Sequence, residues 1–308
     1  MPRDRAAYRN VRFHNASTGA TIGGFYQNGS ITEENLLRIL NDILLIVEDG
    51  QHAWTIQHRA SGRTIAPSSK HPVELGDYDI YSTGSIKITQ EPWLFRLTSP
   101  YPLSGQADQF QHAIRARDGK CVISGQGSLP AQLGDWTGLE AAHVFPLEKE
   151  SLWNELDSGR RWITNNTDDD DDDTVGVASI IHSTQNGLLM SAHLHRRFDQ
   201  YLFSIDPDPK DDYKIVEFGP DGYGIDGRIL DPVCRDPTNT NGRVSDELLR
   251  WHFRQSVLAN MRGAGEPIFE SDFPSGSDMM ATLRDELYGR ERFEMELESR
   301  LRSEITNH

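Results

Sequence analysis

Short apolar segments in the first hundred residues predict a small unit of strands arranged around one helix. The expected strands are residues 11–13, 21–26, 53–57 and 77–81. Between the second and third strand, apolar residues recur at helical spacing, with Thr32 as the expected N-cap and Gly50 as the stop. This apolar stripe consists of Leu36, Leu40, Ile43 and Val47. The order ββαββ indicates a compact sheet crossed by one helix.

The pattern changes after residues 97–106, a segment with two prolines that we take as the boundary of the N-terminal unit. The elements expected beyond it are a helix over residues 108–117, strands over 202–205 and 213–218 that pair as a hairpin, and a helix from Ser245 to Gly263. Ser245 is the expected cap of that helix, and its apolar face is expected to pack on the polar motifs described below.

A stretch rich in Gly, Ser, Pro and acidic residues follows, and then a charged helix at about residues 280–302. Glu and Arg lie four residues apart on that helix, which supports an exposed helix. Its apolar residues could dock on the body or on a second copy, so a homo-oligomer could form through it. The predicted domains are 1–100, a small α/β unit; 101–265, the domain with the motifs; and 266–308, a linker and the charged helix.

Composition is typical of a globular protein, with 308 residues, 36% of them hydrophobic and 25% charged. No apolar run reaches the roughly 20 residues needed to cross a bilayer, and the N-terminus lacks an apolar leader. Two distant cysteines argue against a disulfide framework. We therefore expect an intracellular protein, cytoplasmic or nuclear, without a membrane partner.

The chain carries 47 acidic and 31 basic residues, which gives a net charge of −16. This charge bears on whether nucleic acid can be a partner. Proteins that hold nucleic acid by its phosphates usually gather Lys and Arg, so this acidity argues against such a partner. An uninterrupted run of aspartates, residues 168–173, would repel nucleic acid if it lay near the site. We interpret the run as a solvated insertion, with a calcium-binding or inhibitory role as the alternative.

Three short pieces of the second domain carry the candidate chemistry. His143 lies on a short strand that ends at Pro146, and Asn186 follows in a loop. His195 and Asp199 are four residues apart in a segment with helical spacing, which places an imidazole and a carboxylate on one helix face. Such a pair can hold one cation.

Together with the helix and the Arg117 to Gly125 segment before them, these pieces resemble the HNH nuclease family, in the version common in fungal proteins. The resemblance covers about half the chain. It implies an α+β protein in which a small β-grasp-like N-terminal unit precedes a ββα-metal core with flanking strands and helices. It also implies a metal-dependent endonuclease, a hydrolase that acts on nucleic acid.

The resemblance assigns a role to each residue of the pattern. His143 matches the general base, which takes a proton from water, and Asn186 matches the residue that holds the loop and the base in place. His195 and Asp199 match the metal ligands for one divalent cation, which could be Mg²⁺, Mn²⁺, Ni²⁺ or Zn²⁺.

The sequence departs from the family pattern just before the base, where Ala142 stands at a position that is often a metal ligand. Glu140, on the same strand face, or His182 or His193 could complete the ligand set. Arg196 or Arg197 could reach a phosphate, with a surface salt bridge as the alternative. The Cys-x-x-Cys pairs of a structural zinc site are missing from the sequence.

Two other classes of function stay open beside the nuclease. The first is an HNH scaffold recruited to small-molecule chemistry such as proton transfer or cyclisation, with His143 as base. The second is a non-catalytic regulator with a decayed site. Acidity and Ala142 favour these two, whereas the complete set of His143, Asn186, His195 and Asp199 favours the nuclease.

Overall fold

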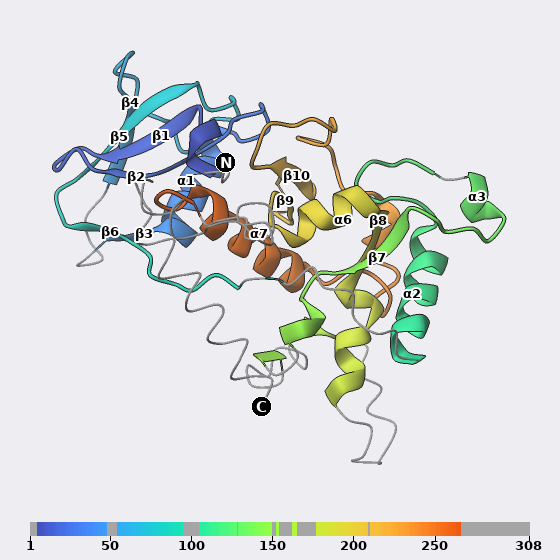
Figure 1. Ribbon diagram of the computed structural model, residues 1–308. Coiled ribbons are helices and arrows are strands. Elements are labelled where there is room, and N and C mark those ends of the chain that lie inside the picture. The colour runs from blue at the N-terminus through green and yellow to red at the C-terminus, as the bar shows by residue number, and fades with distance from the viewer. Residues whose placement is uncertain are drawn as a thin grey trace, which may run out of the picture.

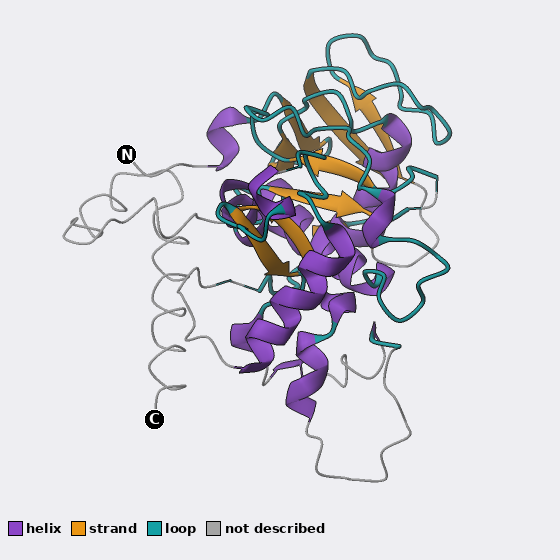
Figure 2. Cartoon of the chain, turned by 90° about the vertical axis from the view of Figure 1, so that its right-hand side faces the viewer, coloured by secondary structure: helices purple, strands orange, loops and turns teal. Residues whose placement is uncertain are grey.

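The computed structural model describes residues 5–47, 54–94, 96, 105–127, 129–149, 152–153, 162–164, 177–208 and 210–265. It has a mixed α/β architecture with several small sheets and is consistent with the expected α+β class (Figures 1 and 2). In Figure 2 the strands gather in the upper part of the view, and helices are concentrated below and between them. The aspartate run and the predicted C-terminal helix lie outside the described residues.

The N-terminal unit contains a four-stranded sheet in the order β2-β1-β5-β4 (Figure 1). Its strands are β1 (Val11–Asn15), β2 (Thr21–Phe25), β4 (Trp54–His58) and β5 (Gly76–Ser82). The central pair β1 and β5 is parallel, and the two outer pairs are antiparallel. All four strands expected from the sequence are therefore confirmed, with bounds shifted by one or two residues.

The helix of this unit, α1 (Glu33–Ile39), is shorter than predicted. Its start is confirmed, because the Thr32 hydroxyl accepts a hydrogen bond from Asn35 N at 3.2 Å and the Asn35 side chain accepts from Thr32 N at 3.1 Å. The predicted continuation to Gly50 is wrong. After α1 the chain forms a short π-helix, η2 (Leu40–Leu44). It then forms the strand β3 (Leu45–Val47), which pairs with β6 (Ile86–Ile88). A run ending in Ile and Val favours a strand once a partner strand is present.

The second half of the described chain alternates short strands and helices. They are α2 (Gly105–Asp118), α3 (Leu129–Gln132), β7 (Leu139–His143), β8 (Gly187–Ser191), α6 (Ala192–Asp199), β9 (Phe203–Asp206), β10 (Lys214–Glu217) and α7 (Asp246–Met261). Short 3-10 helices are η1 (Arg5–Tyr8), η3 (Leu147–Lys149), η4 (Val177–His182), η5 (Thr184–Asn186) and η6 (Pro232–Cys234). The predicted β9–β10 hairpin is confirmed as an antiparallel pair.

The long helix α7 joins two apolar cores. We call the buried cluster with Phe145 and Phe198 the motif core, and the one with Phe13 the N-terminal core. The first turns of α7 enter the motif core, as predicted, through Leu248 and Leu249. Its later residues belong to the N-terminal core, namely Phe253, Val257, Leu258 and Met261. The expected packing is thus right for half of the helix, because one helix of this length reaches both clusters.

The start of α7 also differs from the prediction. Ser245 occupies the N-cap position, but its side chain makes no capping hydrogen bond. Its backbone N instead donates to Gln185 O at 3.0 Å. The helix start is thereby attached to the turn that carries Asn186.

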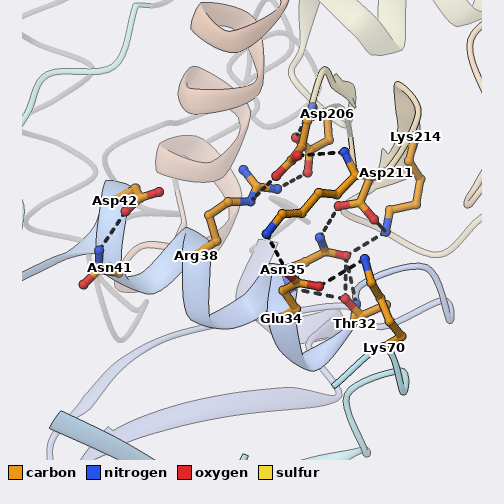
Figure 3. A network of polar contacts seen from close by, with 12 residues as sticks. Thr32, Glu34, Asn35, Arg38, Asn41, Asp42, Lys70, Asp206, Asp211 and Lys214 are labelled. Carbon is orange, nitrogen blue, oxygen red and sulfur yellow. Dashed lines mark hydrogen bonds and ion pairs between the residues drawn. The ribbon is translucent and has the colours of Figure 1, made fainter. Parts of the chain in front are cut away.

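Polar contacts connect α1 with the loop between β9 and β10 (Figure 3). Arg38 forms ion pairs with Asp206 and, at 3.2 Å, with Asp208. Lys214 Nζ lies 2.7 Å from Asn35 Oδ1 and 3.1 Å from Asp211 Oδ1. Basic side chains are therefore paired with carboxylates where α1 meets β9 and the loop after it.

Both cysteines, Cys121 and Cys234, are free, as expected, and both are buried. Within the described ranges, no helix is long and apolar enough to span a membrane.

Candidate active site

Two paired strands followed by a helix carry the predicted site residues (Figure 1). β7 and β8 are antiparallel, and His143, the last residue of β7, pairs with Gly187, the first of β8. α6 begins directly after β8, so the chain passes from the strand to the helix without a loop. β7 and α6 thus place His143 and His195 on neighbouring elements, and α2 lies along both strands.

Asn186 fixes the chain just beyond His143. Its Oδ1 accepts a hydrogen bond from Phe145 N at 2.7 Å, and its Nδ2 donates to Phe145 O at 3.2 Å and to Ile181 O at 2.9 Å. Its backbone carbonyl accepts from Val144 N at 2.9 Å. The residue is fully buried, so its side chain positions the end of β7 and does not face solvent.

The His143 imidazole is packed against α2. Its ring stacks on Phe110 with centroids 3.9 Å apart, and the His182 ring stands edge-on at 5.3 Å. This stacking needs a glycine at 187, because a Cβ there would lie 2.5 Å from the Phe110 ring. Nε2 of His143 is buried and finds no hydrogen-bond partner among the described residues.

The pKa of the His143 imidazole is well below its usual value. Burial is the largest cause, and the positive charges of His182, Arg96 and His195 add to it. The ring is therefore neutral at neutral pH, and its unpartnered Nε2 is available as a proton acceptor. Those same residues form a group of basic side chains around the ring.

His195 lies between two carboxylates. Its Nδ1 is 2.7 Å from Glu140 Oε2, and its Nε2 is 3.3 Å from Asp199 Oδ2. The hydrogen bond from His195 is the largest cause that lowers the pKa of the Glu140 carboxyl. Glu140 therefore contacts the Nδ1 side of the ring, and Nε2 is the ring nitrogen that faces Asp199.

Arg96 is a site residue that the sequence did not indicate. Its guanidinium donates to His143 O at 2.7 Å and to Val144 O at 3.1 Å, and it forms an ion pair with Asp199 Oδ1 at 2.8 Å. The side chain is only 4% exposed. The sequence offers no signal for this contact, because Arg96 lies next to the segment taken as a domain boundary and outside every motif.

Comparison with known families agrees with this geometry. A family model described as HNH endonuclease matches residues 121–206. Residues 121–206 thus match the HNH endonuclease family, and we call them the HNH domain. A second model, a domain of unknown function, matches residues 8–87, which include α1 and the N-terminal sheet. No curated protein and no solved structure matches the chain. At the level of the family, the HNH domain indicates a nuclease with a nucleic-acid substrate and a divalent metal.

Of the other candidate residues in the HNH domain, Glu140 and His182 lie at the site, whereas His193 does not. Glu140 and His182 lie beside His195 and His143, respectively. His193 points elsewhere and stacks on Tyr223 at 4.8 Å. An i, i+2 pair projects to different helix faces, which explains why His193 and His195 separate.

The two arginines of α6 also differ. Arg197 forms an ion pair with the buried Glu217, so the salt-bridge alternative holds for it. Arg196 is exposed, and its charge helps lower the pKa of Glu140. Arg196 is thus the arginine of this pair that can reach a ligand in solvent.

The donors of the HNH domain fit a cation held by few protein ligands. Among the described residues, no group of three or more His, Cys, Asp and Glu side chains is arranged to hold a metal ion. His195 Nε2 and Asp199 Oδ2 are 3.3 Å apart. Neighbouring ligands of an octahedral ion lie about 3 Å apart, so these two atoms can share one. Glu140 bonds the other ring nitrogen and resembles the outer carboxylate that orients a ligating histidine.

Glu217, the partner of Arg197, gives the fold a pH-dependent stability. Burial raises the pKa of this carboxyl to about 7, against the opposing effect of Arg197. A raised pKa means that the folded state binds the proton more tightly than the unfolded chain does. The contribution of Glu217 therefore falls as pH rises from about 4.5 to about 7, by on the order of 3 kcal/mol.

We expect Glu217→Gln to remove this loss. Urea unfolding of both proteins between pH 4.5 and pH 8 should show wild type losing stability relative to the variant across that window. Glu247→Gln is the control, because Glu247 forms an exposed ion pair with Arg250. A pH-independent difference between wild type and Glu217→Gln would contradict the prediction.

Proposed function

We propose that the protein is a metal-dependent endonuclease that hydrolyses phosphodiester bonds with His143 as general base. The observation that carries the proposal is the neutral His143 ring, whose Nε2 has no partner in the described chain. It lies in one site with the His195 and Asp199 pair, whose donors fit a cation. A base beside a cation site is what attack of water on a phosphodiester requires.

In the proposed reaction, His143 Nε2 takes a proton from water while the water oxygen forms a bond to phosphorus. The bond from phosphorus to the departing oxygen breaks, and that oxygen is protonated from solvent. Asn186 keeps the end of β7, and with it His143, in place through its bonds to Phe145 and Ile181. His195 and Asp199 would hold a divalent cation, which neutralises charge on the phosphate and the departing oxygen.

The acidic composition is compatible with this proposal. Asp206, at the end of β9, is paired with Arg38, and Asp211, in the β9–β10 loop, is paired with Lys214. Basic groups converge on His143, and Arg196 is exposed on the helix of the site. Arg96 and Arg196 therefore bring positive charge beside the carboxylates of the site, and we propose the exposed Arg196 as a phosphate contact.

We also propose the finer fold assignments. β7, β8 and α6 would be the ββα-metal core, since they join the base and the ligands in that order. The N-terminal unit would be β-grasp-like, supported by its parallel β1–β5 pair and by α1 between two strand pairs of the chain.

The test is incubation of the purified protein with plasmid DNA and with single-stranded RNA, each without metal and with Mg²⁺, Mn²⁺, Ni²⁺ or Zn²⁺. We expect cutting that requires a metal, and Asp199→Asn should raise the metal concentration for half-maximal rate by about tenfold or more. Asp231→Asn is a matched control, because the Asp231 and Asp199 side chains are 16% and 15% exposed and both are ion-paired. Folded wild-type protein that cuts neither substrate with any metal would refute the proposal.

A further inference from the structure

We propose that Arg96, which lies outside the matched segment 121–206, is a positioning residue of the HNH site and keeps its cation affinity low. Its guanidinium donates to His143 O and Val144 O at 2.7 and 3.1 Å, and it forms an ion pair with Asp199 Oδ1 at 2.8 Å. The first two belong to the end of the strand with the base, and the third belongs to the helix with the ligands. Arg96 therefore fixes the position of the end of β7 relative to α6. This inference rests on the function proposed above.

The segment before Arg96 is held in place by contacts on both sides. Leu94 N donates to Gln255 Oε1 at 2.6 Å, and the Tyr201 hydroxyl donates to Leu94 O at 2.8 Å. The guanidinium carbon itself lies 5.7 Å from the centre of the Phe198 ring and 5.9 Å from that of Tyr201. A guanidinium placed on aromatic faces and buried to this extent has a fixed direction.

Because Arg96 is buried, we assign it a positioning role and not a catalytic one. With 4% of its side chain exposed, Arg96 does not reach a substrate phosphate. It acts on Asp199 by engaging Oδ1, which leaves Oδ2 directed at His195 Nε2. The planar guanidinium of an arginine directs separate donors to the two carbonyls while its charge lies beside the carboxylate, a geometry that the compact ammonium of a lysine does not reproduce.

The charge of Arg96 has a second consequence. A guanidinium next to Asp199 repels a cation that shares this carboxylate, just as a like charge opposes ionisation of a neighbour. With two protein ligands and this repulsion, the free protein binds a divalent cation weakly. An added phosphate supplies further oxygen ligands and negative charge, so cation and nucleic acid bind together.

Two variants separate charge from geometry. Arg96→Met removes the charge and should tighten Mn²⁺ binding about tenfold, measured by calorimetry without substrate, while kcat for DNA at saturating Mn²⁺ falls 10- to 100-fold. Arg96→Lys keeps the charge, so its Mn²⁺ affinity should stay near that of wild type while kcat falls. KM for DNA should change less than about twofold in both, because neither side chain touches substrate. A purely structural defect would weaken metal binding and lower kcat together.

Arg254→Met is the control for damage to the segment. Arg254 Nε donates to Glu91 Oε1 at 2.8 Å and anchors the same stretch away from the site, so this variant should match wild type in Mn²⁺ affinity and kcat. The inference is overturned if Arg96→Met binds Mn²⁺ no more tightly than wild type, or if Arg96→Lys cuts at the wild-type rate. If Arg96→Met does not fold, the kcat of Arg96→Lys is the test. A lower kcat than that of wild type supports the positioning role, and an unchanged kcat overturns it.

The two proposals can fail separately. Wild type that binds Mn²⁺ but does not cut nucleic acid refutes the nuclease and leaves the Mn²⁺ affinity of Arg96→Met to decide the role of Arg96. Wild type that neither binds Mn²⁺ nor cuts refutes both.

Discussion

His143→Ala is expected to lower the rate of metal-dependent DNA cutting by about 10²- to 10⁴-fold, the contribution of a general base. The reason is the neutral ring with an unpartnered Nε2, which can take a proton from water without losing a hydrogen bond. Because the truncation also removes the stacking on Phe110, the free energy of unfolding is measured beside the rate and rates are compared at a temperature where both proteins are folded. Initial rates on supercoiled plasmid at saturating metal measure the effect.

His112→Ala provides the matched control. His112 is exposed on α2, two residues after the Phe110 on which His143 stacks. The control should cut at the wild-type rate. If His143→Ala were to cut within about threefold of wild type, another group would have to be the base.

Asn186→Ala is expected to destabilise the fold by about 4 kcal/mol, because three backbone groups lose their partners in a buried setting. The groups are Phe145 N, Phe145 O and Ile181 O, and no water reaches them without opening the end of β7. The free energy of unfolding from urea titration measures the loss. We also expect cutting to fall, because the same bonds position His143.

Gln185→Ala is the control for that variant. The neighbouring amide also makes three hydrogen bonds, to Thr164 N, Thr164 Oγ1 and Thr240 O, but these partners are only partly buried and can be hydrated. Gln185→Ala should lower the free energy of unfolding by only about 1 kcal/mol. Equal losses for Gln185→Ala and Asn186→Ala would show that the burial of the partners does not set the cost.

The sequence correctly predicted those elements that depend on interactions between residues close together in the chain. The N-cap at Thr32, the four strands of the N-terminal sheet and the β9–β10 hairpin were predicted because capping, β-branched residues and turn residues act within a few positions. The errors have a common cause in distant partners. α1 ends early because β6 pairs with residues 45–47, and Ser245 makes no side-chain cap while its backbone bonds Gln185.

The sequence by itself identified the HNH segment, because the motifs with His143, Asn186 and His195 all lie within residues 121–206, which the family model matches. It also determined that His195 and Asp199 share a helix face, because four residues make about one turn. Which other side chains reach those residues was decided only by the tertiary structure. Arg96 comes to Asp199 from 103 positions away because Gln255 and Tyr201 hold the chain before it. Contacts between residues so far apart depend on packing, and packing leaves no periodic signal in the sequence.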